Sequence, residues 1–184
     1  MSLPFHLEQP IGAPPGVVWR YLLEFQNTRR WMEGTSDVAA LDPGPIAVGA
    51  RFRQTRSIHG RVATVEFVVS ELEEATLTIA LEVDGRKSAL GRGVFRFRYA
   101  MQPSGAATRV VVDGSIDELG RAVELVASLF VGKFVKVVAK DLEALRRALE
   151  ADVGEGSVGA GGVAPTRADA APITTSSTSR APST

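Results

Sequence analysis

The chain has 184 residues, of which 45% are hydrophobic and 23% charged, a composition that excludes fibrous and membrane proteins and fits an ordinary globular protein. Lysine plus arginine and aspartate plus glutamate both number 21, so there is no global field to attract nucleic acid or an anionic membrane. Without cysteine, and with two histidines, the chain lacks the residues for disulfides, thiolate chemistry or a metal site rich in cysteine or histidine, and we expect no cofactor.

Targeting signals are not apparent. The N-terminus lacks a basic segment followed by an apolar run, so we expect no signal peptide. A membrane span needs ~18 to 20 apolar residues free of charge, and the best candidate is interrupted by Lys133, Lys136 and Lys140. The sequence therefore predicts a cytoplasmic protein with no transmembrane segment and no nucleic-acid partner; a protein partner stays unknown.

The N-terminal region predicts a strand followed by two short helical segments. Phe5 and Leu7 alternate with polar residues, as expected of a strand. Two prolines then stand where the first turn of a helix accepts proline, and the apolar residues after them follow helical spacing, which predicts a helix over residues 15–25. A shorter helical or irregular piece over residues 27–33 carries Trp31.

Beyond residue 35 the apolar period changes from helical to two. Six segments that end in turn signals predict six strands joined by short connections, in an antiparallel meander. Strand alternation then divides the residues between two faces. The residues expected on the inner face are Ala63, Val65, Phe67, Val69, Leu77, Ile79, Leu81, Val83, Phe95, Phe97, Tyr99, Met101, Val110, Val112 and Ile116. The residues expected to face water include Thr64, Glu66, Arg96, Arg98 and Asp113.

A long amphipathic helix is predicted over residues 120–150, which at 1.5 Å per residue is about 45 Å, enough to cross the sheet. Its second half has the single apolar stripe of a helix that packs on a sheet. In the first half Leu125, Leu129, Val131 and Val135 widen the stripe. The additional apolar surface needs more cover than a flat sheet provides.

The composition changes again near residue 152. Residues 152–184 consist largely of glycine, alanine, serine, threonine and proline, with almost nothing large enough to bury. Such a segment cannot offset the entropy of ordering. We therefore expect one folded domain over residues 1–151 and a disordered tail over residues 152–184, inert or, alternatively, a tether or docking segment.

The order of these elements resembles the helix-grip fold of the START-like, or SRPBCC, superfamily, in its polyketide cyclase/dehydrase-like form. The residues that carry the resemblance are APPGVVWRYLLEF at 13–25, Trp31, VGARF at 48–52 and the closing helix, and the match covers residues 3–150. It implies an α+β fold: a curved antiparallel seven-stranded sheet wrapped around a long C-terminal helix, with two short helices between strands 1 and 2. It also implies an apolar cavity between sheet and helix.

The residues that we expect to line this cavity are Trp31, Phe67, Leu81, Phe95, Phe97, Tyr99, Val126, Phe130 and Phe134. Sites of this kind are mostly apolar, with a few polar groups that fix the orientation of the ligand. The alternative is that these side chains pack against one another as a solid core.

Two polar side chains are candidates for orienting a ligand. Strand parity with Phe52 and Gln54 places Arg56 on the inner face, where it could bind a carboxylate or polarise a carbonyl. A bulge that returns Arg56 to water is the alternative. Tyr99 could donate a hydrogen bond to the ligand, or could be a core tyrosine that reaches solvent.

The first functional hypothesis is a module that binds a small hydrophobic molecule of lipid, polyketide or isoprenoid type, for carriage or sensing. The alternatives are a polyketide cyclase/dehydrase-like enzyme and a protein-interaction module without a small ligand. An inward cluster of ionisable groups would distinguish the enzyme, and parity identifies Arg56 alone as a member. The sequence contains no recognisable catalytic triad, metal cluster or phosphate loop, so no residue is assigned as catalytic.

Overall fold

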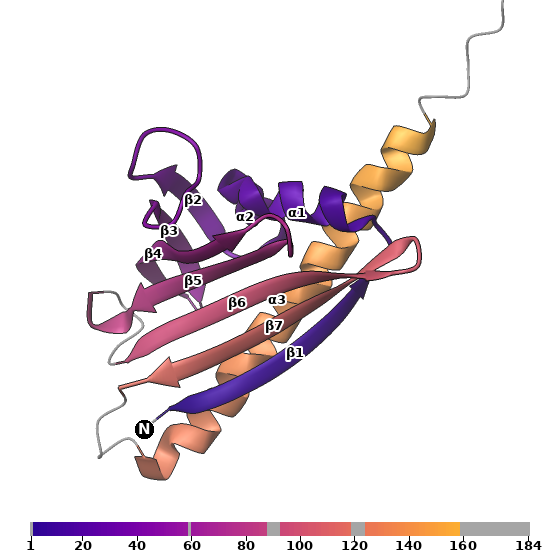
Figure 1. Ribbon diagram of the computed structural model, residues 1–184. Helices are drawn as coiled ribbons and strands as arrows, with labels where there is room; N and C mark the ends of the chain where they lie inside the picture. The colour runs from indigo at the N-terminus through magenta and orange to yellow at the C-terminus, as the bar shows by residue number, and fades with distance from the viewer. Residues whose placement is uncertain (1, 59, 88–92, 119–123, 159–184) are drawn as a thin grey trace, which may run out of the picture.

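The computed structural model describes residues 2–58, 60–87, 93–118 and 124–158. Its strands are β1 (Leu3–Ile11), β2 (Thr35–Ala40), β3 (Arg51–Ile58), β4 (Arg61–Glu73), β5 (Thr78–Asp84), β6 (Val94–Ser104) and β7 (Ala107–Asp117). They form one antiparallel sheet in the order β1-β7-β6-β5-β4-β3-β2 (Figure 1). The predicted meander is confirmed, and β1 closes it by pairing with the last strand, β7.

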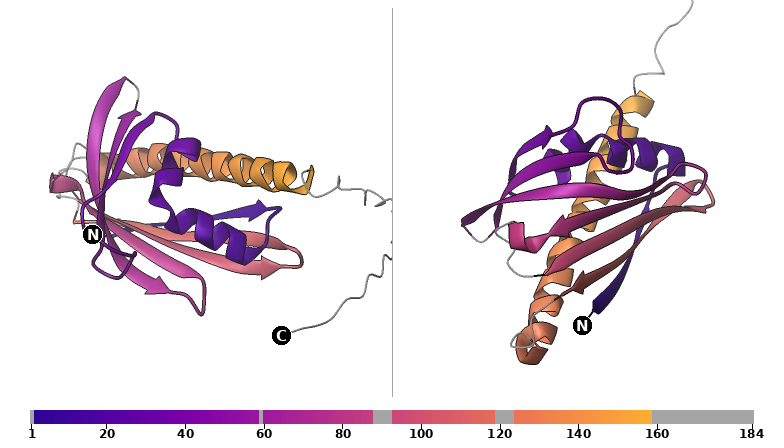
Figure 2. Two further views of the ribbon diagram at one scale, coloured as in Figure 1. Left: turned by 90° about the horizontal axis from the view of Figure 1, so that it is seen from above. Right: turned by 60° about the vertical axis from the view of Figure 1, so that its left-hand side comes forward.

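The helices are α1 (Pro15–Leu23), α2 (Thr28–Trp31) and α3 (Glu124–Val158), with 3-10 turns η1 (Phe25–Asn27) and η2 (Gly85–Lys87). Proline stands in the first turn of α1, where its missing N–H costs nothing. Seen from above, the sheet curves strongly and α3 lies along its hollow side (Figure 2). The predicted helix-grip arrangement, with two short helices between β1 and β2, is confirmed.

The two faces of the sheet differ as the alternation predicts. Val69, Val83 and Phe95 are buried on the inner face, whereas Glu66 and Arg98 are exposed on the outer face. The outer charges form ion pairs across neighbouring strands, as an alternating, solvated face should. These pairs include Arg96 with Glu82 at 2.9 Å, Arg98 with Glu71 at 3.0 Å and His6 with Asp113 at 2.7 Å.

The main hydrophobic core lies under the second half of α3. There Leu142, Leu145 and Leu149 pack with Val18 and Trp19 of α1 and with apolar side chains of the sheet. All five side chains are at most 5% exposed. This dense packing holds α1 and the C-terminal half of α3 as a fixed end wall of the interior.

The helix α3 continues to Val158, past residue 151, where we expected the folded domain to end. Residues 152–158 are therefore helical, although their composition predicts a disordered tail. Asp152 accounts for part of the extension, because its carboxylate accepts two hydrogen bonds from Arg30 at 2.6 and 2.8 Å. Residues 159–184 lie outside the described residues. Among the helices that the structure describes, none is long and apolar enough to cross a membrane.

Candidate ligand-binding site

An aromatic cluster joins α3 to the inner face of the sheet. The Phe134 ring lies 5.4 Å from that of Phe95 and 5.9 Å from those of Phe97 and Phe5, between ring centroids. Such tilted and edge-on contacts stabilise aromatic pairs by about 0.5 to 1.5 kcal/mol beyond the burial of their area. The structure thus brings together three of the predicted site residues and adds Phe5.

Phe5 reaches this cluster because the residue opposite it has no side chain. Phe5 pairs with Gly114 of β7, which in turn pairs with Phe97 of β6. A Cβ on Gly114 would lie 2.1 Å from Cζ of Phe5, so the ring occupies the space above the glycine. A glycine in the middle of a strand that otherwise alternates is the sequence signal for such a close approach.

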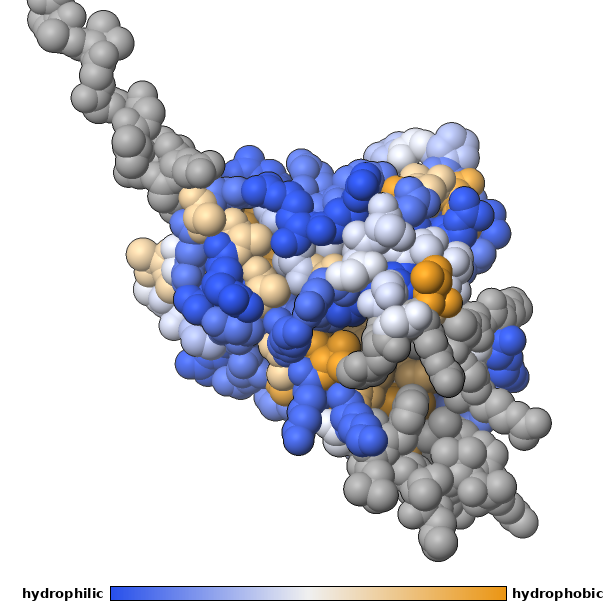
Figure 3. Space-filling model, turned by 180° about the vertical axis from the view of Figure 1, so that it is seen from behind, coloured by the Kyte–Doolittle hydropathy of each residue, from blue (hydrophilic) through white to orange (hydrophobic). Residues whose placement is uncertain are grey.

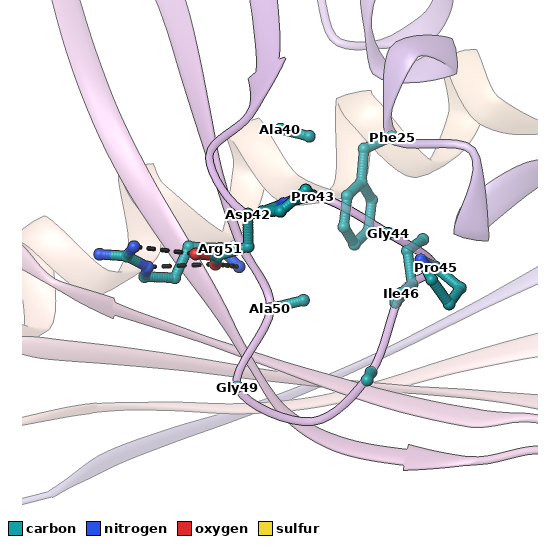
Figure 4. A pocket seen from close by; sticks show the side chains of 11 residues that line it. Phe25, Ala40, Asp42, Pro43, Gly44, Pro45, Ile46, Gly49, Ala50 and Arg51 are labelled. Atoms are coloured by element: carbon teal, nitrogen blue, oxygen red, sulfur yellow. Dashed lines mark hydrogen bonds and ion pairs between the residues drawn. The ribbon is translucent and has the colours of Figure 1, made fainter.

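A second aromatic group lies on the same inner face, nearer the edge of the sheet formed by β2. Phe67 stacks on Phe52 with centroids 4.8 Å apart, and Phe52 stacks on Phe25 at 3.7 Å. Phe25 also lines a surface pocket of about 290 Å³ formed by the connection between β2 and β3 (Figure 4). Of the predicted site residues whose side chains the structure describes, none lines this pocket.

The centre of the inner face is incompletely covered. Phe67, Leu81, Phe97 and Phe134 remain half-buried, although their neighbours along the same strands, such as Val83, are buried. On the face of the molecule that carries α3, apolar surface also shows between hydrophilic side chains (Figure 3). Large apolar side chains that stay accessible on an inner face are what a binding cavity requires and what a solid core avoids.

Arg56 points inward. The irregularity beside it lies on β2, between Thr35 and Asp37, whereas β3 keeps an unbroken register with β4, so no bulge in β3 returns Arg56 to water. Its guanidinium donates two hydrogen bonds to the carboxylate of Asp141 on α3, at 2.7 and 2.8 Å. A third goes from Nε to the backbone carbonyl of Glu33 at 2.7 Å. The Arg56 and Asp141 side chains are 15% and 7% exposed, so this is a largely buried, bidentate pair.

The turn that supplies the Glu33 carbonyl requires a glycine. Gly34 has a φ of 81°, and a Cβ there would lie 2.3 Å from the carbonyl oxygen of Ser57. Its own carbonyl accepts the Ser57 N–H at 2.9 Å. The chain after α2 is thereby pressed against β3 beside Arg56. The side chain of Glu33 pairs with Lys140, which lowers its pKa, so a second ion pair flanks the first.

Asp141 is a candidate site residue that strand parity could not reveal. Burial raises the pKa of its carboxyl above the ordinary value, against the opposing effect of the hydrogen bonds from Arg56. A signal was present in the sequence. Val138, Leu142 and Leu145 occupy the apolar stripe of α3, and Asp141 lies three residues after the first and four before the last. A carboxylate on that stripe indicates an inward partner of opposite charge.

Tyr99 and Trp31 are buried, at 7% and 4% exposed. Burial raises the pKa of Tyr99 well above its usual range, with a smaller contribution from the charge of Asp141. Nε1 of Trp31 has no hydrogen-bond acceptor among the described residues. Trp31 also lines a second surface pocket, of about 320 Å³, between α2 and α3.

The two remaining predicted residues, Val126 and Phe130, belong to α3, but their side chains lie outside the described residues.

Residues 4–150 match the family model described as "Polyketide cyclase / dehydrase and lipid transport". The chain belongs to this family. The matched residues include all of the described sheet except Leu3, and most of α3. No curated protein matches the chain significantly.

The chain, a member of the polyketide cyclase / dehydrase and lipid transport family, is similar in fold to several solved structures. The Zhui aromatase/cyclase from Streptomyces sp. R1128 is 17% identical, with a TM-score of 0.67, covering 89% of this chain and 100% of its own. TTHA0849 from Thermus thermophilus is 16% identical, with a TM-score of 0.66, covering 82% and 99%. Major latex-like protein 151 from Panax ginseng is 12% identical, with a TM-score of 0.65, covering 80% and 97%. At these identities the likeness shows a shared fold and nothing further.

Proposed function

We propose that the protein binds a small hydrophobic molecule of lipid, polyketide or isoprenoid type between the inner face of the sheet and α3, for carriage or sensing. The observation that carries the proposal is the half-buried apolar strip of Phe67, Leu81, Phe97 and Phe134 under the helix. Membership in a family described by polyketide cyclisation and lipid transport supports it. Apolar burial, at roughly 25 cal/mol per Å², would supply most of the affinity.

The polar end of the bound molecule would be oriented by Arg56 and Tyr99. The Tyr99 hydroxyl makes no hydrogen bond within the described part of the chain. It would therefore be free to donate to a ligand oxygen. Arg56 is already satisfied by Asp141, so a ligand would meet the pair as a unit rather than a bare cation.

Native mass spectrometry of freshly purified protein is the first test. We expect a discrete adduct of a hydrophobic molecule, which denaturation would release for identification. A chain that stays free of ligand after incubation with lipid and polyketide extracts contradicts the proposal and favours a protein-interaction module instead.

A matched pair of variants locates the site. Leu81→Trp adds a large ring to the half-buried strip, whereas Val62→Trp adds the same ring where the side chain is 70% exposed. With the neutral fluorescent probe Nile red, we expect Leu81→Trp to weaken binding by about tenfold or more, because the added ring fills the space of the ligand. Val62→Trp should bind as the unmodified protein does. Equal affinity in both variants would place the ligand elsewhere.

A cyclase or dehydrase activity is the second candidate, and the Arg56–Asp141 pair favours it. A carboxyl group with a raised pKa beside a bidentate arginine is suited to proton transfer, with the arginine holding a carbonyl oxygen. Arg56→Lys keeps the charge and removes the bidentate geometry. Loss of turnover on a poly-β-ketone with unchanged Nile red binding would support the enzyme. Absence of turnover by the unmodified protein would contradict the enzyme and favour the proposed role in carriage or sensing.

A further inference from the structure

A cleft between α2 and α3 has a surplus of positive charge. Its volume is about 320 Å³, at the lower end of the range of small-molecule sites. Four cationic side chains line it, two from α2 and two from α3: Arg29, Arg30, Lys140 and Arg147. The acidic side chains in its lining are Glu33 and Asp141, and each already has a cationic partner.

Two of the four cations are available to a ligand. Arg29 has no ion pair or hydrogen bond among the described residues. Arg147 makes one long hydrogen bond, from Nε to the backbone carbonyl of Glu143 at 3.4 Å. The carboxylate of Glu143 lies 3.9 Å from Arg147 and is held instead by Arg146 at 2.6 Å. Arg29 and Arg147 belong to different helices, so they would approach a ligand from two walls of the cleft.

Small residues form part of the lining of the cleft, Gly34 after α2 and Ala144 on α3. Ala144 lies one turn before Arg147 and one turn after Lys140 on the same face of α3, and it lines the cleft between them. Its short side chain leaves the hollow that longer neighbours surround. Trp31 forms another part of the lining, and its buried Nε1–H has no acceptor within the described structure.

We propose that this α2–α3 cleft binds a small molecule through a carboxylate or phosphate group held between Arg29 and Arg147. Guanidinium groups match the geometry of both oxyanions and bind them by two parallel hydrogen bonds. The apolar strip of the interior proposed above is separate from this cleft, because none of Phe67, Leu81, Phe97 and Phe134 lines it, although Trp31 and Asp141 border the cleft. It would let the protein respond to an anionic metabolite while the interior holds an apolar one.

The test is a titration of the full chain with inorganic phosphate and with benzoate, followed by NMR at about 0.15 M ionic strength, where diffuse surface attraction is largely screened. We expect saturable shifts of the backbone amides of Gly34 and Ala144 with at least one of the two anions. The anion that binds more tightly identifies the class of oxyanion. Shifts that fail to saturate with both anions would overturn the proposal.

Variants separate a built site from general attraction to arginine. Arg29→Met should weaken binding by about tenfold, as expected for one charge-assisted contact, and Ala144→Leu should abolish it by filling the cleft. Arg53→Met is the matched control, because Arg53 is also exposed and unpaired among the described residues but lies on the outer face of β3. Equal loss in the Arg29 and Arg53 variants, or none in either, would overturn the proposal. Nile red affinity should be unchanged in all three, so failure here is separable from failure of the interior site.

Discussion

The inner and outer faces of this sheet both carry arginine–carboxylate pairs, yet the two kinds of pair differ in what they can do. On the outer face, Arg98 and Glu71 are 46% and 41% exposed. On the inner side, Arg56 and Asp141 are 15% and 7% exposed and join the sheet to α3. The same type of ion pair is therefore solvated on the outer face and largely desolvated on the inner side, where it joins two elements. Burial and the connection to a second element, rather than the count of ion pairs, distinguish the inner pair from the outer ones.

Removal of the inner carboxylate should give the largest effect. Asp141→Ala leaves the Arg56 guanidinium largely buried without its bidentate acceptor. We expect a loss of about 3 to 5 kcal/mol in the free energy of unfolding, measured by urea denaturation. The matched change on the outer face, Glu71→Ala, should cost about 0 to 1 kcal/mol. Similar losses in the two variants would remove the distinction between the faces.

A double replacement sharpens this comparison. Arg56→Met with Asp141→Leu substitutes apolar side chains for both charges, which often recovers the stability that a single replacement loses. We expect unfolding close to that of the unmodified protein. If the pair orients a ligand, the double variant should remain folded and select ligands differently in native mass spectrometry. An unchanged ligand profile would assign the pair a purely structural role.

Two glycines provide the next largest contrast. On the inner face, Gly114→Ala would displace the Phe5 ring from Phe97 and Phe134, and we expect a loss of about 1 to 3 kcal/mol. On the exposed side of α3, a Cβ on Gly132 would meet no described atom within 4 Å beyond the adjacent residues and the backbone of its own helix, so Gly132→Ala should stabilise by up to about 1 kcal/mol. Thermal unfolding should therefore shift in opposite directions. A shift of the same sign in both would contradict the packing of Phe5 over Gly114.

The smallest effect concerns an outer-face histidine. The hydrogen bond that the His6 ring makes to the carboxylate of Asp113 raises the pKa of this exposed histidine above its ordinary value of 6.5. Because the folded pKa is raised, the stabilisation by this contact is complete below the unfolded pKa and disappears as the pH rises through the folded one. An NMR titration of the His6 ring should show the raised pKa, and Asp113→Asn should lower it. An unchanged pKa in that variant would exclude the contact in solution.

The fold was largely predictable because alternation and helical spacing are properties of single elements. The strands from β3 to β7 could each be assigned inner residues from their own sequence, and the assignment of Phe95 and Val69 to the inner face is confirmed. The candidate site was less accessible because it depends on contacts between elements. Asp141 meets Arg56 across 85 positions of sequence, and no local pattern specifies that distance. Phe5 enters the aromatic cluster because of a glycine on another strand.

The size of the interior is harder to predict still. Whether Phe67 and Leu81 line open space or pack shut depends on the rotamers of side chains from several elements, and a shift of about 1 Å decides between the two. The end of α3 shows a similar limit. Composition predicted a tail from residue 152, whereas the contact of Asp152 with Arg30 stabilises the helix beyond that point.

The pairing of β1 with β7 has a consequence for synthesis on the ribosome. Leu3 pairs with Ile116, so the first strand has no partner until nearly the whole sheet has been translated. At about 5 to 20 residues per second, β1 would wait several seconds as an unpaired apolar strand. Such long-range closure is slow and exposes the nascent chain to aggregation. We expect chaperone binding during translation to persist until β7 has emerged, and to end early in a circular permutant that begins at β2.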